Sequence, residues 1–102
     1  MADRKTLHAK LCEILGSSNV YFQPPEDLKM TYPCIRYAYS GVSERRANDA
    51  LYDYTMQYTM VLITKKESID LAMEFVKQIP MCRLERPYTG GNLYHYQFTL
   101  YH

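Results

Sequence analysis

Histidine and cysteine are the residues of this sequence best suited to catalysis or metal binding. A structural zinc site needs several such ligands close together, as in C-x-x-C with H-x-x-x-H. Here they are scattered along the chain: His8, Cys12, Cys34, Cys82, His95 and His102. The odd count and long spacings of the cysteines favour reduced thiols packed as small apolar side chains. We therefore expect neither a metal nor a cofactor.

The sequence also contains no local motif that indicates an enzyme. A Cys–His nucleophilic pair such as Cys34 with His95 would meet only in the folded chain, so the sequence leaves it open. Glu26-Asp27 and the pair Glu44 and Asp49 lie among solvated neighbours, whereas acid–base pairs are typical of apolar clefts. G-x-S-x-G, P-loop and G-x-G-x-x-G motifs do not occur. We expect a protein that is not an enzyme.

The net charge is +1, with 12 Lys and Arg against 11 Asp and Glu. A surface for nucleic-acid phosphates would need a basic stripe. Arg45 and Arg46 are adjacent, but the acidic residues Glu44 and Asp49 flank them, which favours a solvated loop over a phosphate site. Stacking of single strands on tyrosines would need interleaved basic residues, and the strands offer no dense pattern of them.

The sequence offers no sign of a membrane segment. No apolar run approaches the roughly 20 residues that a membrane helix needs. The first ten residues lack the apolar region of a secretory signal. We expect folding in a cytoplasm and no membrane partner.

Residues 51–64, LYDYTMQYTMVLIT, are the longest stretch that reads as one strand. Strict alternation places Tyr58, Met60 and Leu62 on one face and polar residues on the other. Val61 and Ile63 make the polar face apolar at the far end, so we expect that end to be covered on both sides. A strand of this length is either central to its sheet or extends beyond it to meet a partner, and we expect the first half to extend beyond the domain.

The remaining elements have weaker patterns. Apolar spacing predicts helices over residues 3–15, ending at a left-handed Gly16, and over 69–79, capped by Ser68. Strands are predicted over 20–22, 34–40, 81–88 and 93–101, with a turn at 89–92. We expect an α+β fold, with two helices packed on one face of a mostly antiparallel sheet of about four strands. Residues 1–102 form one domain, in which a polar loop, 41–50, projects from a long β-hairpin.

Several stretches, in order, resemble small tail-completion proteins of long-tailed bacteriophages, also called tail terminators or head–tail joining proteins. They are VYFQPPE at 20–26, MTYPCIRY at 30–37, Tyr52 with YTMVLIT at 58–64, PMC at 80–82 and NLYHYQFTLY at 92–101. The resemblance covers nearly the whole chain from Val20 onward. The turn at 65–68, KKES, departs from the Asp-Pro-Asp type of turn common in such proteins.

The resemblance implies a structural virion protein of the phage neck, assembled in the bacterial host cytoplasm. Such a protein forms a homo-oligomeric ring, a hexamer, that caps the tail tube and joins it to the head connector. Its partners would be its own copies, the tail tube protein and the head connector or stopper, with genomic DNA only as cargo through the lumen. The alternative is another neck component, a connector adaptor or stopper protein. The sequence favours both over a small cytoplasmic binding module or enzyme.

In that setting the polar loop and the adjoining strand would contact neighbouring subunits or partners. The expected interface residues are Ser43, Glu44, Arg45, Arg46, Asn48, Asp49, Tyr52 and Tyr54.

Overall fold

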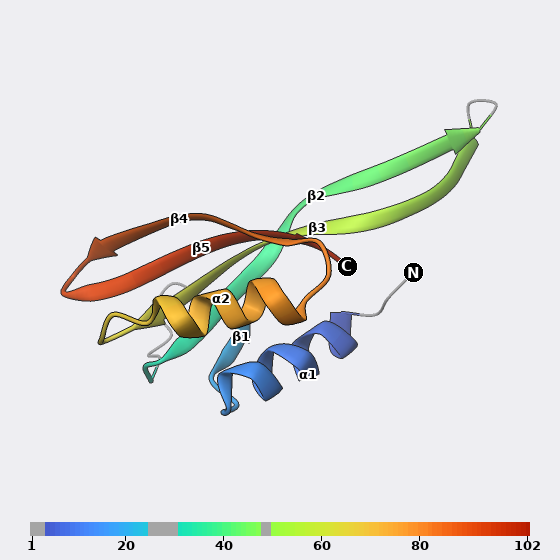
Figure 1. Cartoon of the computed structure of the whole chain (residues 1–102). Helices are drawn as coiled ribbons and strands as arrows, with labels where there is room; N and C mark the ends of the chain where they lie inside the picture. Colours follow the sequence, from blue (N-terminus) through green and yellow to red (C-terminus); the bar gives the residue numbers. More distant parts are fainter. Residues whose placement is uncertain (1–3, 25–30, 48–49) are drawn as a thin grey trace.

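The computed structural model describes residues 4–24, 31–47 and 50–102, without the side chains of residues 51–53. The described residues form two helices and five strands (Figure 1). In chain order these are α1 (Arg4–Leu15), β1 (Val20–Phe22), β2 (Cys34–Ala47), β3 (Ala50–Thr64), α2 (Ile69–Gln78), β4 (Cys82–Gly90) and β5 (Leu93–Tyr101).

All five strands join one sheet in the order β1-β2-β3-β5-β4. The short β1 pairs parallel to β2, from Val20 opposite Ile35 to Phe22 opposite Tyr37, and every other pair is antiparallel. Parallel neighbours need a crossover connection rather than a tight turn, which the long segment between β1 and β2 provides. The expected α+β class is confirmed, with five strands rather than about four.

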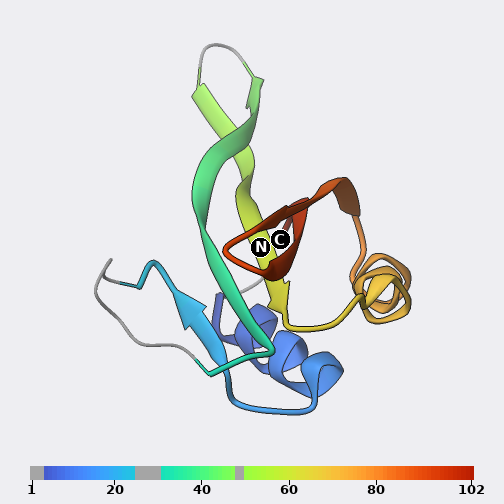
Figure 2. The ribbon, with the colours of Figure 1, turned by 90° about the vertical axis from the view of Figure 1, so that its left-hand side faces the viewer.

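Both helices cover the same face of the sheet (Figures 1 and 2), as expected. The core between them consists of the apolar side chains that alternation placed inward. They include Leu7 and Leu11 of α1, Ala72 and Phe75 of α2, and Ile35, Tyr37, Tyr58, Met60, Leu62, Tyr96, Phe98 and Leu100 of the sheet. Tyr39 of β2 and Tyr94 of β5 share this face by alternation, but their side chains are 46% and 37% exposed.

The helix ends differ in how well the sequence predicted them. Gly16 has φ +80°, and its N–H donates to the Cys12 carbonyl over 2.9 Å, so the expected left-handed ending of α1 is confirmed. Ser68 stands at the start of α2, but its hydroxyl donates to the Lys66 carbonyl instead of accepting from the helix. Glu67 Oε1 accepts the Ile69 N–H at 2.8 Å in its place.

The turn between β4 and β5 is tighter than residues 89–92. β4 runs to Gly90 and β5 begins at Leu93, which leaves Gly91 and Asn92 as the turn. Their φ angles, +59° and +63°, are those of a two-residue type I′ hairpin loop, whose twist matches the flanking strands.

The predicted polar loop is wrong for residues 41–47, which continue β2 as far as Ala47. They pair with β3 until Ala47 lies opposite Ala50. Apolar alternation marks a strand only when one of its faces is buried. Residues 41–47, GVSERRA, have no covered face, so their sequence shows no alternation of apolar and polar residues. Their backbone nevertheless pairs with β3. Residues 48 and 49 lie outside the described part of the chain.

Candidate assembly interface

The β2–β3 hairpin extends well beyond the rest of the sheet, and we call residues 41–47 with 50–56 the arm (Figure 1). β1 ends where Phe22 pairs with Tyr37, and β5 ends where Tyr101 pairs with Gln57. The arm is therefore a two-stranded ribbon, about 20 Å long at 3.4 Å per residue. It contributes to the elongated shape of the chain, whose Cα atoms span 51 × 29 × 23 Å.

A β-bulge separates the arm from the body of the sheet. Tyr39 pairs with Tyr58 and Gly41 with Gln57, so Ser40 has no partner. A Cβ at Gly41 would lie 3.1 Å from Oε1 of Gln57, and glycine permits this close approach of the two strands. The extra residue shifts the alternation of β2, so that Val42 and Glu44 continue the helix-side face, opposite Met56 and Tyr54.

A second irregularity lies near the arm's end, between Arg45 and Arg46. Arg45 pairs with Asp53 and Arg46 with Leu51, so here Tyr52 of β3 is the residue without a partner. The two bulges insert one residue into each strand, and the original register is restored at Ala47 and Ala50. Bulges increase local twist and re-aim side chains, which explains the strong twist of the arm in Figure 2.

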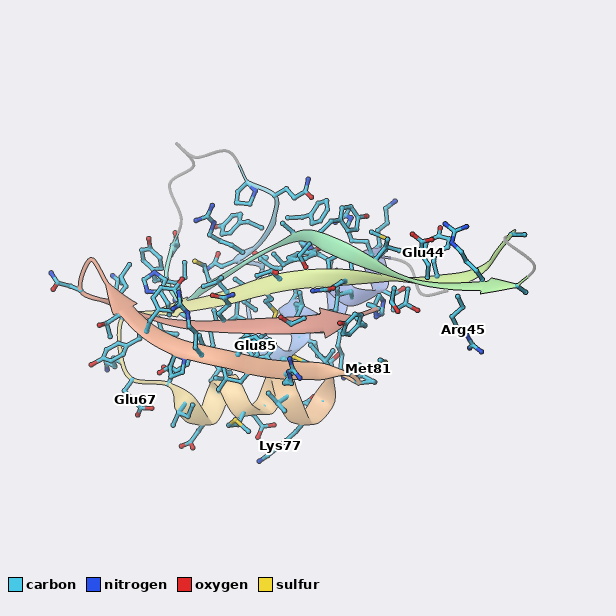
Figure 3. All side chains as sticks on the ribbon, turned by 90° about the horizontal axis from the view of Figure 1, so that it is seen from above. Glu44, Arg45, Glu67, Lys77, Met81 and Glu85 are labelled. Carbon is cyan, nitrogen blue, oxygen red and sulfur yellow. The ribbon has the colours of Figure 1, made fainter. Side chains whose placement is uncertain are left out.

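The structure divides the predicted interface residues between the two faces of the arm. Glu44, Arg46 and Tyr54 lie on the helix-side face, and Arg46 forms an ion pair with Glu44. Ser43 and Arg45 lie on the opposite face; Figure 3 shows Glu44 and Arg45 pointing to opposite sides of the ribbon. All these β2 side chains are exposed, whereas Tyr54 is half-buried. Asn48, Asp49 and the Tyr52 side chain lie outside the described residues.

Sequence reasoning missed the apolar part of the arm. Val42 is 45% exposed and lies opposite the half-buried Met56, while Tyr39 is 46% exposed at the base of the arm. We call Tyr39, Val42, Glu44, Tyr54 and Met56 the arm stripe, because they share the helix-side face. The alternation in β3 predicted the face on which Met56 lies. The face of Val42 could not be predicted, because it depends on the bulge at Ser40.

A cluster of aromatic rings anchors the base of the arm. Phe22 lies 5.0 Å from Tyr37 and 5.1 Å from Tyr39 between ring centroids, and Tyr58 lies 5.9 and 5.1 Å from the same two tyrosines. Burial raises the pKa of Tyr37 and raises that of Tyr58 to about 12, so both phenols are neutral at pH 7. Rings packed in this way hold the two strands where the sheet narrows.

Helix α1 secures this cluster from below. Tyr37 Oη lies 2.7 Å from His8 Nδ1, and it accepts a hydrogen bond from Arg4 over 3.2 Å. The Arg4 guanidinium also lies 4.3 Å from the centre of the Phe22 ring, within cation–π range. The start of α1 is thus tied to both β1 and β2, which fixes the base from which the arm projects.

The face of the sheet away from the helices carries an open groove of about 480 Å³, which we call the outer groove. Its lining residues come from the end of β1 and from β2, β3, β4 and β5: Gln23, Pro24, Arg36, Tyr37, Ala38, Thr59, Val61, Ile63, Tyr88 and His95. Ile63 is 5% exposed, so the expected covering of the far end of β3 on both sides is confirmed for this residue.

An aromatic stack forms one wall of the outer groove. The rings of Tyr88 and His95 are nearly parallel, with centroids 4.7 Å apart, and the Arg86 guanidinium lies 4.9 Å from the Tyr88 centroid. His95 Nδ1 is buried and has no hydrogen-bond partner among the described residues.

The possible nucleophilic pair of Cys34 and His95 is not formed. Cys34 pairs with Ile63, and Ile63 with His95, so the two residues share a face of the sheet but are separated by β3. Burial also raises the pKa of Cys34 to about 11, which keeps its thiol protonated at neutral pH. An activated cysteine requires the opposite shift.

The described residues hold no group of three or more His, Cys, Asp or Glu side chains that could bind a metal ion. Neither of their helices combines the length and apolar character that crossing a membrane requires.

Comparison with protein-family models, with curated proteins and with solved structures gave no match to this chain.

Proposed function

We propose that this chain is a structural protein of the bacteriophage neck, which forms a ring that caps the tail tube and joins it to the head connector. The ordered stretches from Val20 to Tyr101 that resemble tail-completion proteins support this proposal. Its partners are further copies of the same chain, the tail tube protein and the head connector. The hexameric ring is the form that the resemblance implies.

The arm is the observation that carries the proposal. An isolated two-stranded ribbon is at best marginally stable in water. This one also exposes the apolar side chain of Val42, and Tyr39 is exposed at its base. Contact with a neighbouring subunit would cover this apolar surface and stabilise the ribbon.

Disruption of the gene in the phage that encodes this chain tests the proposal. Loss of the protein is expected to leave filled heads and tails that do not join, and the plasmid-borne wild-type chain restores whole particles. In a reconstruction of those particles the chain is expected as a ring on top of the tail tube. Whole, infectious particles without the protein, or a ring elsewhere in the virion, would overturn the proposal. A ring attached to isolated heads would identify an adaptor or stopper instead.

Arm variants refine this test. The double substitution Arg45→Ala and Arg46→Ala removes two exposed charges from the arm, and surface changes of this kind typically alter stability by less than about 0.5 kcal/mol. It is expected to reduce joining while the chain stays folded. Lys65→Ala with Lys66→Ala is the matched control, because it removes the same charge from an exposed turn of the body. Equal joining by both double variants would contradict an interface role for the two arginines.

A further inference from the structure

The arm stripe and the outer groove lie on opposite faces of the same sheet. The stripe continues the helix-side face, on which Tyr39 and Val42 are about half exposed. The groove lies on the face that no helix covers, and its apolar lining includes Ala38 and Val61. A chain therefore cannot place its own stripe in its own groove. A second chain in a similar orientation can.

One charge on each surface can pair with the other. On the helix-side face of the arm Glu44 forms an ion pair with Arg46, and the Glu44 side chain is still 38% exposed. Arg36 is the charged residue in the groove lining; it is exposed and forms no ion pair within the described part of the chain. Complementary charges at an interface fix register and exclude wrong partners.

The apolar lining of the groove also suits a β-ribbon. Sheets pack face to face at about 10 Å, with the side chains of each filling the space between them. The stripe supplies the exposed side chains of Tyr39 and Val42, and the groove lining supplies Ala38, Val61 and the Tyr88 ring.

We propose that the arm stripe of one copy occupies the outer groove of a second copy. This inference rests on the proposed ring and names the two surfaces that build it. Because the surfaces differ, the contact is head-to-tail: each chain offers an arm to one neighbour and a groove to the other. Such heterologous contacts close into a ring when the rotation between subunits permits it, unlike a two-fold contact, which stops at a dimer.

Two single variants separate the surfaces. Val42→Asp damages the stripe and leaves the groove intact, whereas Arg36→Glu damages the groove and leaves the stripe intact. Both positions are exposed, so the fold is expected to persist, and circular dichroism checks this. Lys65→Glu is the control, since it makes the same charge reversal at an exposed site outside both surfaces.

Sedimentation of the purified chain at concentrations up to about 1 mM is the assay. The wild type and Lys65→Glu are expected to form species larger than a dimer. Each damaged variant alone is expected to associate at least about tenfold more weakly. An equimolar mixture of the two variants is expected to form a heterodimer and nothing larger, because it retains one intact stripe and one intact groove. Adding Glu44→Arg to Arg36→Glu is expected to restore self-association.

Normal association of Arg36→Glu would overturn the inference in favour of a stripe-to-stripe contact. A mixture that stays monomeric, or a wild type that is monomeric throughout, would also overturn it. These measurements need no phage particle. A ring found at the head–tail junction can therefore stand while the arm-and-groove contact fails, and the contact can stand while the proposed location fails.

Discussion

Replacing Leu62 with alanine tests whether the C-terminal part of β3 is packed in the core that holds the arm. Leu62 is 0% exposed, lies between Ile35 and Tyr96 on neighbouring strands, and faces the helices. The substitution removes three carbon atoms, whose transfer from water is worth about 0.8 kcal/mol each, or about 2.4 kcal/mol together. The cavity left behind adds to this cost, because the hydrogen-bonded strands on both sides of Leu62 cannot move inward to fill the empty space.

We therefore expect the free energy of unfolding to fall by about 3–4 kcal/mol, a large part of the 5–15 kcal/mol typical of a domain. Urea unfolding followed by circular dichroism measures the loss, with an unchanged slope as the sign that the folded state is the same. Val42→Ala is the control: it removes carbon atoms from an exposed position of the arm and is expected to cost less than about 0.5 kcal/mol. Equal costs for the two variants, or a loss below about 1 kcal/mol for Leu62→Ala, would refute the assignment of core and arm.

Other predictions concern the buried thiols and the β4–β5 turn. Burial raises the pKa of Cys34 and Cys82 from 9.0 to about 11, so the stability that their protonated forms contribute is complete below pH 9 and is lost as the pH rises toward 11. The urea midpoint is expected to fall over that range, and a midpoint that rises would contradict it. At pH 8 the half-buried Cys12 is expected to react first with a thiol reagent, and denaturation should expose the other two; three equally fast thiols in the native chain would refute the burial. Gly91→Ala forces a side chain onto a residue at φ +59° and is expected to cost about 1 kcal/mol in urea unfolding, whereas Gly90→Ala, whose new Cβ would approach only His95 Cε1 at 3.8 Å, is the control.

The elements that bury one face were predictable from sequence. The alternation in residues 51–64 identified Tyr58, Met60 and Leu62 as inward residues of a central strand, because a period of two matches the pleat. Apolar spacing located both helices, and in α2 Phe75 is fully buried whereas Met73 is 37% exposed. Gly16 marked the end of α1, since its left-handed conformation favours glycine.

The candidate site was predictable only in part. The sequence directed attention to the segment around Arg45 and Arg46, and those residues do lie on the projecting hairpin. The sequence suggested a loop there, because residues 41–47 bury neither face and therefore need no alternation of apolar and polar residues. The order of the side chains along the ribbon depends on two bulges, and nothing in the residue types at Ser40 or Tyr52 announces them.

Residue types and their spacing were enough to identify the side chains that must leave water, and so the α+β class, the two helices and the inward face of the long strand. Burial of apolar area is the largest favourable term in folding, and it requires apolar residues at a regular period. The folded chain was needed to show that residues 41–47 form a strand, that Val42 joins Tyr39 and Met56 on one stripe, and that Arg36, Tyr88 and His95 line one groove. Those placements depend on strand register and on pairing between distant segments, and neither can be predicted from local composition.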